Sequence, residues 1–389
     1  MSSVNKGWKK FVPSAAIYVF HFSCVGIMIT FLSPYLADLG FTGTQIGLLL
    51  SLPAVARVLS PLLWGYMADK TGRTVGVLRL VIVLSLLTPL LFLEARSFTG
   101  IAIILFVFAS TKTAVPALND AVTMKMIKQF GGLYSDIRVW GSIGFVVSAV
   151  VMGKLIEGSQ DYAKLSVIAL TGCYAITLIA SLFLNSKGIE HKPVNYRSVQ
   201  KLFENRRIVV LFLASSLHWA STMPYHGFLP VHVREIQMAS SIAGVCFGVA
   251  GVAEIIMMSQ SRRLFQIFKP HQLFALSLLV TGLRWFVMTL NLNESLLVAI
   301  QFLHAFTFTG FFVSAIEIIL EEIPDELRAT GQGLFFAASF GLGGGIGSVL
   351  AGYAFEIRGG EASFMVGGFL SLFALFVSRG LGPQQSDNG

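Results

Sequence analysis

The chain has 389 residues, of which 54% are hydrophobic and only 12% charged, and its mean hydropathy is +0.74. Because soluble proteins carry about 25% charged residues, this composition excludes an ordinary soluble protein and indicates a polytopic membrane protein. The net charge of +8 follows from where Lys and Arg fall around the membrane, so it does not require a nucleic-acid partner.

Twelve apolar stretches, each long enough to cross a bilayer, follow one another along the chain. They fall at residues 11–38, 43–68, 74–95, 99–127, 135–158 and 162–186, and then at 207–234, 240–266, 272–293, 295–322, 328–356 and 361–382. The first stretch is too long for a signal peptide and lacks a small-residue cleavage site, so we expect a retained helix. The pattern predicts an all-α membrane protein with an N-terminal bundle over 1–186, a cytoplasmic linker over 187–206 and a C-terminal bundle over 207–389.

The distribution of Lys and Arg predicts the orientation. Placing both termini, the linker and the even-numbered loops on one side gathers 19 of the 28 basic residues there and leaves five on the other side. The remaining four lie inside the membrane: Arg57, Lys112, Arg138 and Arg284. By the positive-inside rule both termini are expected in the cytoplasm, with the protein in a cell inner membrane.

Two charges stand out in the stretch from Thr111 to Phe145. Asp120 and Arg138 lie nine residues either side of Gln129, which is beside a glycine turn. At roughly 1.5 Å per helical residue, each lies on the order of 13 Å from that turn, near the middle of a hydrocarbon core about 30 Å thick. Charged side chains at this depth usually mark a pathway or a binding site. The alternative is a structural ion pair that locks two helices.

The second half also carries polar faces on apolar helices. His218, Thr222 and Tyr225 recur at helical spacing. A second stripe at the same spacing consists of Gln301, His304, Phe308 and Phe311. Such faces predict a central polar cavity, although a histidine on an apolar helix is more often a packing residue. The four deep cations outnumber Asp120 and Glu254, and this positive surplus favours an anionic substrate.

The sequence GYMADKTGR resembles the signature that the major facilitator superfamily carries between its second and third helices. Gly65, Asp69, Lys70, Gly72 and Arg73 fill every position of that signature, at the expected place. The resemblance implies two pseudo-symmetric six-helix bundles and a gating role for these five residues. Asp69 would accept hydrogen bonds from a helix N-terminus and from basic groups, and so hold the cytoplasmic side shut.

Further segments extend the resemblance over nearly the whole chain: LPAVARVLSPLLWGYMAD, ALNDA, IRVWGSIGF, GVAEII, GLRWFVM and LHAFTFT. They are similar to the proton-linked permeases that include phenylpropionate permeases, nucleoside symporters and, more distantly, the lactose permease. There a helix 4 acid and a helix 5 Arg bind substrate, and the 18-residue spacing of Asp120 and Arg138 matches that pair. The resemblance aligns Glu254 with a helix 8 acid and His304 with a helix 10 His. Thr307 stands where the lactose permease has a second acid, and phenylpropionate-type permeases also carry Thr there.

We therefore predict a secondary transporter that works by alternating access and imports a small organic anion, such as an aromatic carboxylate, with protons. The alternatives are a proton symporter of a neutral nucleoside or sugar, and a lipid-handling or signalling membrane protein without solute transport. The candidate substrate-binding residues are Asp120, Arg138, Lys112, Tyr225, His218, Arg284 and Phe145. The candidates for proton coupling are Asp120, Glu254 and His304.

The sequence contains no nucleophile elbow, phosphate loop or nucleotide-binding motif, so we expect no enzymatic activity and no cofactor. Cys24, Cys173 and Cys246 lie far apart without paired spacing, which supports neither a disulfide framework nor a metal site. The expected partners are the small-molecule substrate, protons and the lipid bilayer, and the expected state is a monomer.

Overall fold

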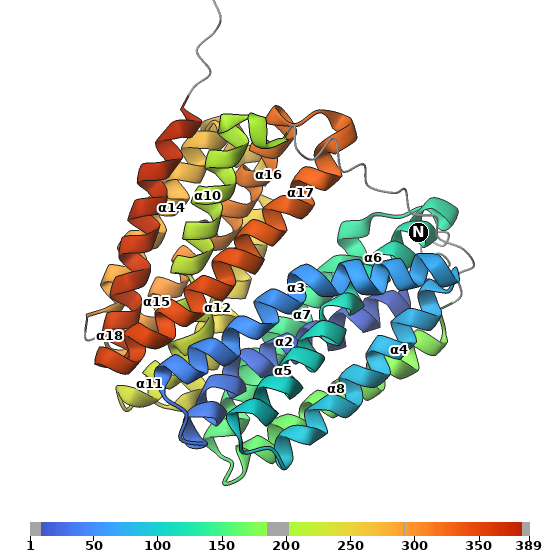
Figure 1. Ribbon diagram of the computed structural model, residues 1–389, viewed down its shortest axis with the longest axis horizontal. Coiled ribbons are helices and arrows are strands. Elements are labelled where there is room, and N and C mark those ends of the chain that lie inside the picture. The colour runs from blue at the N-terminus through green and yellow to red at the C-terminus, as the bar shows by residue number, and fades with distance from the viewer. Residues whose placement is uncertain (1–8, 185–201, 291, 383–389) are drawn as a thin grey trace, which may run out of the picture. The chain divides into compact units, whose positions relative to one another are not determined.

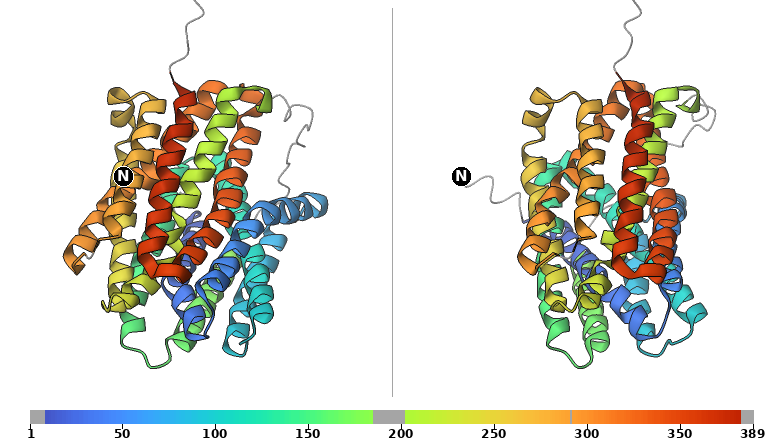
Figure 2. Two further views of the ribbon diagram at one scale, coloured as in Figure 1. Left: turned by 60° about the vertical axis from the view of Figure 1, so that its left-hand side comes forward. Right: turned by 90° about the vertical axis from the view of Figure 1, so that its left-hand side faces the viewer.

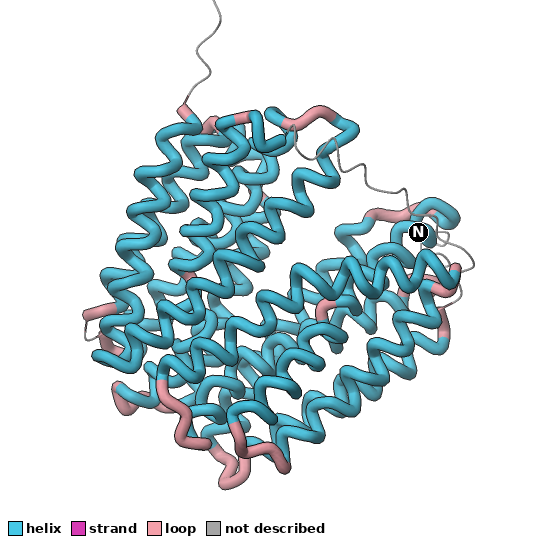
Figure 3. Tube along the Cα trace, viewed as in Figure 1, coloured by secondary structure: helices cyan, strands magenta, loops and turns pink. Residues whose placement is uncertain are grey.

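The structure is a computed structural model that describes residues 9–184, 202–290 and 292–382, and within these ranges it contains helices and loops but no strand (Figure 3). Eleven helical stretches there are long and apolar enough to cross a membrane. The last of them, Thr330–Leu381, is interrupted at Arg358 and at Gly359, where the backbone takes a φ of +62°. Since that stretch comprises two spans, the all-α architecture with twelve spans is confirmed.

By their contacts the helices form two compact units, and the first contains the described residues of Met1–Phe41, Val55–Lys192 and Ile236–Gly248. Its helices are α2 (Val12–Asp38), α4 (Thr74–Leu87), α5 (Phe98–Lys112), α6 (Ala114–Phe130), α7 (Tyr134–Glu157), α8 (Tyr162–Leu182), the second part of α3 (Gly43–Thr71) and the first part of α12 (Ser240–Ser259) (Figure 1). Helix α2 packs along both α7 and α8. The predicted helix at 99–127 is divided into α5 and α6, because Pro116 cannot donate a hydrogen bond to the carbonyl of Lys112.

The second unit contains the described residues of Thr42–Ala54, Pro193–Glu235 and Val249–Gly389, and so includes the first part of α3 and the second part of α12. Its other helices are α10 (Arg206–Ser221), α11 (Leu229–Glu235), α13 (Ser261–Ile267), α14 (Pro270–Met288), α15 (Glu294–Ala299), α16 (Phe311–Glu322), α17 (Arg328–Phe336) and α18 (Gly344–Ser378). Helix α18 packs along α10 and α14 (Figure 2). The core of this unit is built around the fully buried rings of Phe274, Phe311 and Phe335.

Three π-helical turns interrupt the helices of the second unit: η2 (Pro224–Phe228), η4 (Ala305–Gly310) and η6 (Ala337–Gly343). A π-helical turn adds a residue to the helical turn, so the side chains beyond it are rotated relative to a regular α-helix. Two of these turns lie in the segments where the sequence predicted uninterrupted polar stripes, at 207–234 and 295–322. The structure therefore changes which residues of those segments share a face.

Most predicted boundaries lie within a few residues of the observed ones. The stretch predicted at 162–186 ends at Leu182, and the one predicted at 272–293 occupies Pro270–Met288, with Pro270 in the first turn where its missing N–H has no helical partner to lose. Asn205 caps the start of α10, because its Oδ1 accepts hydrogen bonds from two backbone N–H groups.

Residues 187–201 of the predicted linker lie outside the described residues. The division at that linker, and the orientation of the termini, stay predictions.

Close approach of α2 and α7 in the first unit depends on glycine. A Cβ atom at Gly26 would lie 2.7 Å from the carbonyl oxygen of Phe145, and one at Gly144 would lie 2.9 Å from the carbonyl carbon of Val19. Glycine removes these clashes and lets the two backbones touch, and in lipid such packing replaces the hydrophobic effect as the force between helices.

We predict that Gly144→Val destabilises the first unit by about 1–3 kcal/mol, because a side chain at this position overpacks the contact between α2 and α7. Gly172→Val, in α8, is the matched control, since nothing lies within 4 Å of a Cβ atom there. The measurement is thermal denaturation of both purified variants in one detergent. Equal melting temperatures for Gly144→Val and Gly172→Val would contradict the role assigned to Gly144.

Candidate functional site

In the first unit, the carboxylate of Asp120 is held by two tyrosines. The Tyr18 hydroxyl, on α2, donates a hydrogen bond to Oδ1 of Asp120. The Tyr134 hydroxyl, at the start of α7, donates to the same oxygen at 2.9 Å. Hydrogen bonds to an ionised group are stronger than those between neutral groups. The two hydroxyls therefore stabilise Asp120 in place and join α2, α6 and α7.

Arg138 lies against aromatic rings rather than against an acid. Its guanidinium carbon is 4.1 Å from the centre of the Phe22 ring and 5.4 Å from that of Tyr18. Cations are attracted to the faces of aromatic rings. Among the described residues, Arg138 makes no ion pair with Asp120, although both contact Tyr18. The structure thus brings the predicted pair into one cluster without the direct salt bridge of the alternative interpretation.

Helical spacing explains how the chain builds this cluster. Tyr134 and Arg138 are four residues apart on α7, and Tyr18 and Phe22 are four apart on α2, so each pair shares a face. Gly141 lies one turn beyond Arg138, and a Cβ atom there would be 2.8 Å from Arg138 Nη1 and 2.8 Å from Phe22 Cδ2. Glycine at this position therefore leaves room for the stack of Arg138 on Phe22.

The other two candidates of the first unit are placed differently. Lys112 ends α5, and its ammonium lies 5.8 Å from the centre of the Phe108 ring. Among the described residues it forms no ion pair with Asp120. Phe145 contributes its carbonyl oxygen, which accepts a hydrogen bond from Ser148 at 3.0 Å. The predicted substrate-binding roles of Lys112 and Phe145 stay predictions.

In the second unit, Arg284 on α14 is completely buried in a network of polar groups. Its Nη1 donates to His304 Nδ1 at 3.0 Å and to Thr307 Oγ1 at 3.2 Å, and its Nη2 donates to Gln301 Oε1. The rings of Tyr225 and Trp285 lie 4.6 Å and 4.5 Å from the guanidinium carbon. Neutral partners thus occupy two edges of the guanidinium and aromatic rings contact it, so Arg284 is held in one orientation.

Glu254 completes this network through His304, since its Oε1 lies 2.8 Å from His304 Nε2. Arginine can only donate, so the Nδ1 atom of His304 that faces Arg284 must accept. The proton of the neutral imidazole is then on Nε2, where it is donated to Glu254. In this arrangement Glu254 is the carboxylate that balances the charge of Arg284, with His304 as a neutral bridge.

His218 and Tyr225 join the network on different sides. His218 Nε2 donates to the Thr307 carbonyl oxygen at 2.9 Å, and its ring lies 4.1 Å from that of Phe311. Tyr225 lies in the π-helical turn η2, so it no longer follows the regular spacing from His218 that the sequence suggested. Its ring lies 5.3 Å from that of His304. Both residues are buried beside the Arg284 network.

The signature residues lie at the end of α3 and the start of α4, in the first unit. Gly72 has a φ of +62°, a conformation that favours glycine, and its N–H donates to the Asp69 carbonyl oxygen at 3.2 Å. The Lys70 ammonium lies 5.8 Å from the Tyr66 ring centre, and Arg73 is the residue before α4. A Cβ atom at Gly65 would meet nothing within 4 Å. The turn is the expected one, and the gating role of these residues stays a prediction.

The sequence analysis missed the aromatic partners of the charges. Tyr18, Phe22 and Tyr134 were not named as candidates, although the four-residue spacing of Tyr134 from Arg138 could have identified one of them. Trp285 was missed because it neighbours Arg284 along the chain rather than one turn away. Among the described residues, no group of three or more His, Cys, Asp or Glu side chains is placed to hold a metal ion.

Twelve spanning helices that enclose charged side chains, within the described residues, define a multi-pass membrane protein. The structure matches a crystal structure of the nucleoside transporter NupG with a TM-score of 0.82, covering 95% of this chain and 98% of that one at 19% sequence identity. At this identity the likeness shows the shared fold. The chain belongs to the MFS_1 like family, whose model matches residues 13–366.

The curated relatives are transport proteins rather than enzymes. A probable 3-phenylpropionic acid transporter of Escherichia coli (strain K12) is 25% identical over 366 residues, which cover 92% of this chain and 95% of that protein. The maltose permease of Geobacillus stearothermophilus is 23% identical, with 87% and 86% covered. The nucleoside permease NupG of Escherichia coli (strain K12) is also 23% identical, with 85% and 84% covered. Transport of a small molecule across a membrane is therefore the function of the family to which this chain belongs.

We predict that Arg284→Ala lowers the free energy of unfolding by at least about 3 kcal/mol, since it leaves His304, Thr307 and Gln301 buried without their donor at roughly 1–3 kcal/mol each. Arg262→Ala, at an exposed position of α13, is the matched control. The measurement is thermal denaturation of the purified variants. A melting temperature for Arg284→Ala equal to that of Arg262→Ala would show that the network does not stabilise the second unit.

Proposed function

We propose that the protein imports a small organic anion, such as an aromatic carboxylate, together with protons by alternating access. The observation that carries the proposal is the guanidinium of Arg138, which contacts two aromatic rings and makes no ion pair among the described residues. A planar guanidinium can bind a carboxylate through two parallel hydrogen bonds. The adjacent rings of Phe22 and Tyr18 can pack against an aromatic group of the same substrate.

The relative named as a probable 3-phenylpropionic acid transporter supports this substrate class, since such an acid combines a carboxylate with an aromatic ring. A neutral nucleoside or sugar is the second candidate, supported by the relatives named as nucleoside and maltose permeases. Asp120 favours that candidate, because a carboxylate accepts hydrogen bonds from substrate hydroxyls. The two candidates differ in their need for the planar fork of Arg138.

Glu254 is the proposed site of the coupled proton, with His304 and Asp120 as further candidates. His304 Nδ1 accepts from Arg284, so a proton added to this network is accommodated on Glu254 rather than on His304 while that hydrogen bond persists. Protonation of Glu254 would leave the charge of Arg284 unbalanced. In the first unit, a substrate carboxylate that binds Arg138 would favour protonation of Asp120, and this would couple substrate binding to proton binding.

The proposed setting is a cell inner membrane, with both termini in the cytoplasm. The asymmetric distribution of Lys and Arg supports this orientation. The signature residues between α3 and α4, Asp69 above all, would then lie on the cytoplasmic side. There we propose that they control opening of that side, as the resemblance to the superfamily implies.

The first functional prediction concerns Arg138→Lys. We expect it to weaken binding of an aromatic carboxylate about 10- to 100-fold, because lysine keeps the charge but cannot form two parallel hydrogen bonds. Binding is measured by isothermal calorimetry on the purified protein, with Arg262→Lys as the control. Unchanged affinity for every organic acid, with binding of nucleosides or sugars instead, would favour the second candidate.

The second functional prediction concerns coupling. In proteoliposomes with an imposed pH gradient, wild-type uptake should follow the gradient, and Glu254→Gln should abolish that dependence while leaving exchange of labelled for unlabelled substrate. Asp120→Asn is compared in the same assay, and Glu294→Gln, an exposed residue, is the control. Wild-type accumulation that ignores the gradient would refute symport. Accumulation that follows it in both variants would show that Glu254 and Asp120 are not the carriers.

A further inference from the structure

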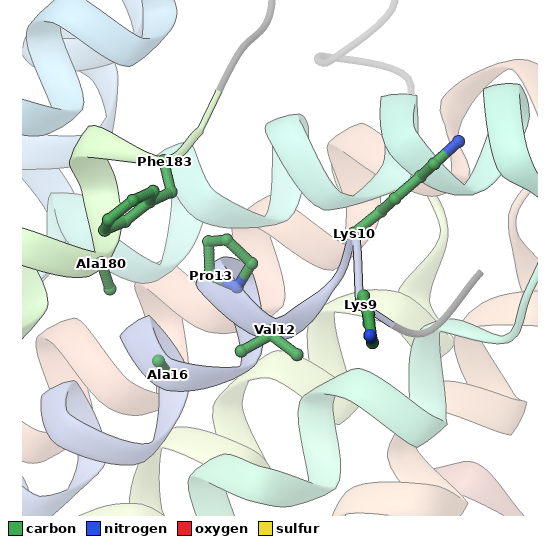
Figure 4. A pocket seen from close by; sticks show the side chains of 7 residues that line it. All are labelled: Lys9, Lys10, Val12, Pro13, Ala16, Ala180 and Phe183. Carbon is green, nitrogen blue, oxygen red and sulfur yellow. The ribbon is translucent and has the colours of Figure 1, made fainter. Parts of the chain in front are cut away.

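A cavity of about 410 Å³ lies at the start of α2 in the first unit. Its lining residues come from the turn before α2, from the first turns of α2 and from the end of α8, and they are Lys9, Lys10, Val12, Pro13, Ala16, Ala180 and Phe183. The two lysines lie at one end of the cavity, and Phe183 and Ala180 lie at the other (Figure 4). The cavity is therefore basic at one end and apolar along the rest.

Its position along the helices places it at the membrane surface. Helix α2 begins at Val12 and α8 ends at Leu182, so the cavity lies where two spanning helices end together. At this level the hydrocarbon core meets the lipid headgroups. Val12 is 49% exposed and Phe183 is 73% exposed. This apolar surface is thus left uncovered by the described part of the chain, at a depth where acyl chains are available to cover it.

The basic end is fixed by a contact with a third helix. The Lys10 ammonium lies 3.6 Å from the centre of the Phe130 ring, at the end of α6. A cation over an aromatic face keeps its charge and is held in place. Neither Lys9 nor Lys10 forms an ion pair with an acidic side chain of the described residues. Both lysines therefore lie at one edge of the groove; the Lys10 side chain extends away from the groove toward Phe130 (Figure 4), and neither lysine has an acidic partner among the described residues.

We propose that this cavity binds an anionic phospholipid, with its phosphate at the basic edge that Lys9 and Lys10 form and an acyl chain along Val12, Ala16 and Phe183. Charge complementarity selects this occupant, because basic residues at a membrane surface attract anionic headgroups, each strengthening binding roughly fivefold. The apolar wall then selects a lipid over a free phosphate ion. This inference does not depend on which solute the protein transports.

The experiment is native mass spectrometry of the full chain in detergent, titrated separately with phosphatidylglycerol, phosphatidylcholine and inorganic phosphate. We expect saturable binding of one phosphatidylglycerol, weaker binding of phosphatidylcholine, and no displacement of the bound lipid by millimolar phosphate. Equal retention of the two lipids would overturn the proposal, since it would show that the lysines do not select charge. Displacement by phosphate would overturn it as well, since the apolar wall would then contribute nothing.

Two kinds of variant place the binding at this cavity. Lys9→Gln combined with Lys10→Gln should weaken phosphatidylglycerol binding about 25-fold, as two lysines each contribute roughly fivefold. Ala16→Trp fills the groove without changing charge, and it should also weaken binding. Lys164→Gln, an exposed lysine at the opposite end of α8, is the control and should bind as the wild type does. Wild-type binding in both cavity variants, with melting temperatures showing that they are folded, would assign the lipid to another place.

Discussion

The structure depends on how charged side chains are accommodated inside helices that cross a membrane. A buried charge must be satisfied by partners within the protein, because the surrounding hydrocarbon offers none. Each unit accommodates one such arginine, and Arg284 is fully buried whereas Arg138 is half-buried. The two Nη atoms of Arg284 donate to neutral acceptors, namely the side chains of Gln301, Thr307 and His304. Arg138 is instead held against aromatic faces, and its hydrogen-bonding edge makes no ion pair among the described residues.

This difference gives the two arginines different roles. A guanidinium that already donates to three buried side chains is a structural centre, and moving it would leave those acceptors unpaired. A guanidinium held by its face is positioned but can still offer donors to a ligand. Asp120 is likewise held without a charged partner. The hydroxyl groups of Tyr18 and Tyr134 donate to its carboxylate, and Arg138 makes no direct ion pair with it.

The charged part of the candidate site could be predicted from the sequence, because a charge in an apolar stretch is costly and therefore conspicuous. Asp120, Arg138 and Glu254 were identified in this way, whereas His304 was identified from a polar stripe and from the family resemblance. In the structure His304 Nε2 lies 2.8 Å from Glu254 Oε1. The aromatic partners could not be predicted so easily. With 33 phenylalanines in the chain, the position of Phe22 carries little information by itself. Which ring meets which charge depends on how α2 packs against α7.

The π-helical turns explain why the residues predicted to share a helix face differ from those that share one in the structure. One of these turns also determines the position of Thr307. Because η4 follows His304 directly, Thr307 is placed where its hydroxyl can accept from Arg284 while its carbonyl oxygen accepts from His218. An acid at that position would form an ion pair with Arg284 and balance its charge directly. With threonine there, Glu254 remains the carboxylate that balances Arg284, through His304. A proton on Glu254 would therefore change the net charge of the network by one and leave Arg284 without its balancing carboxylate.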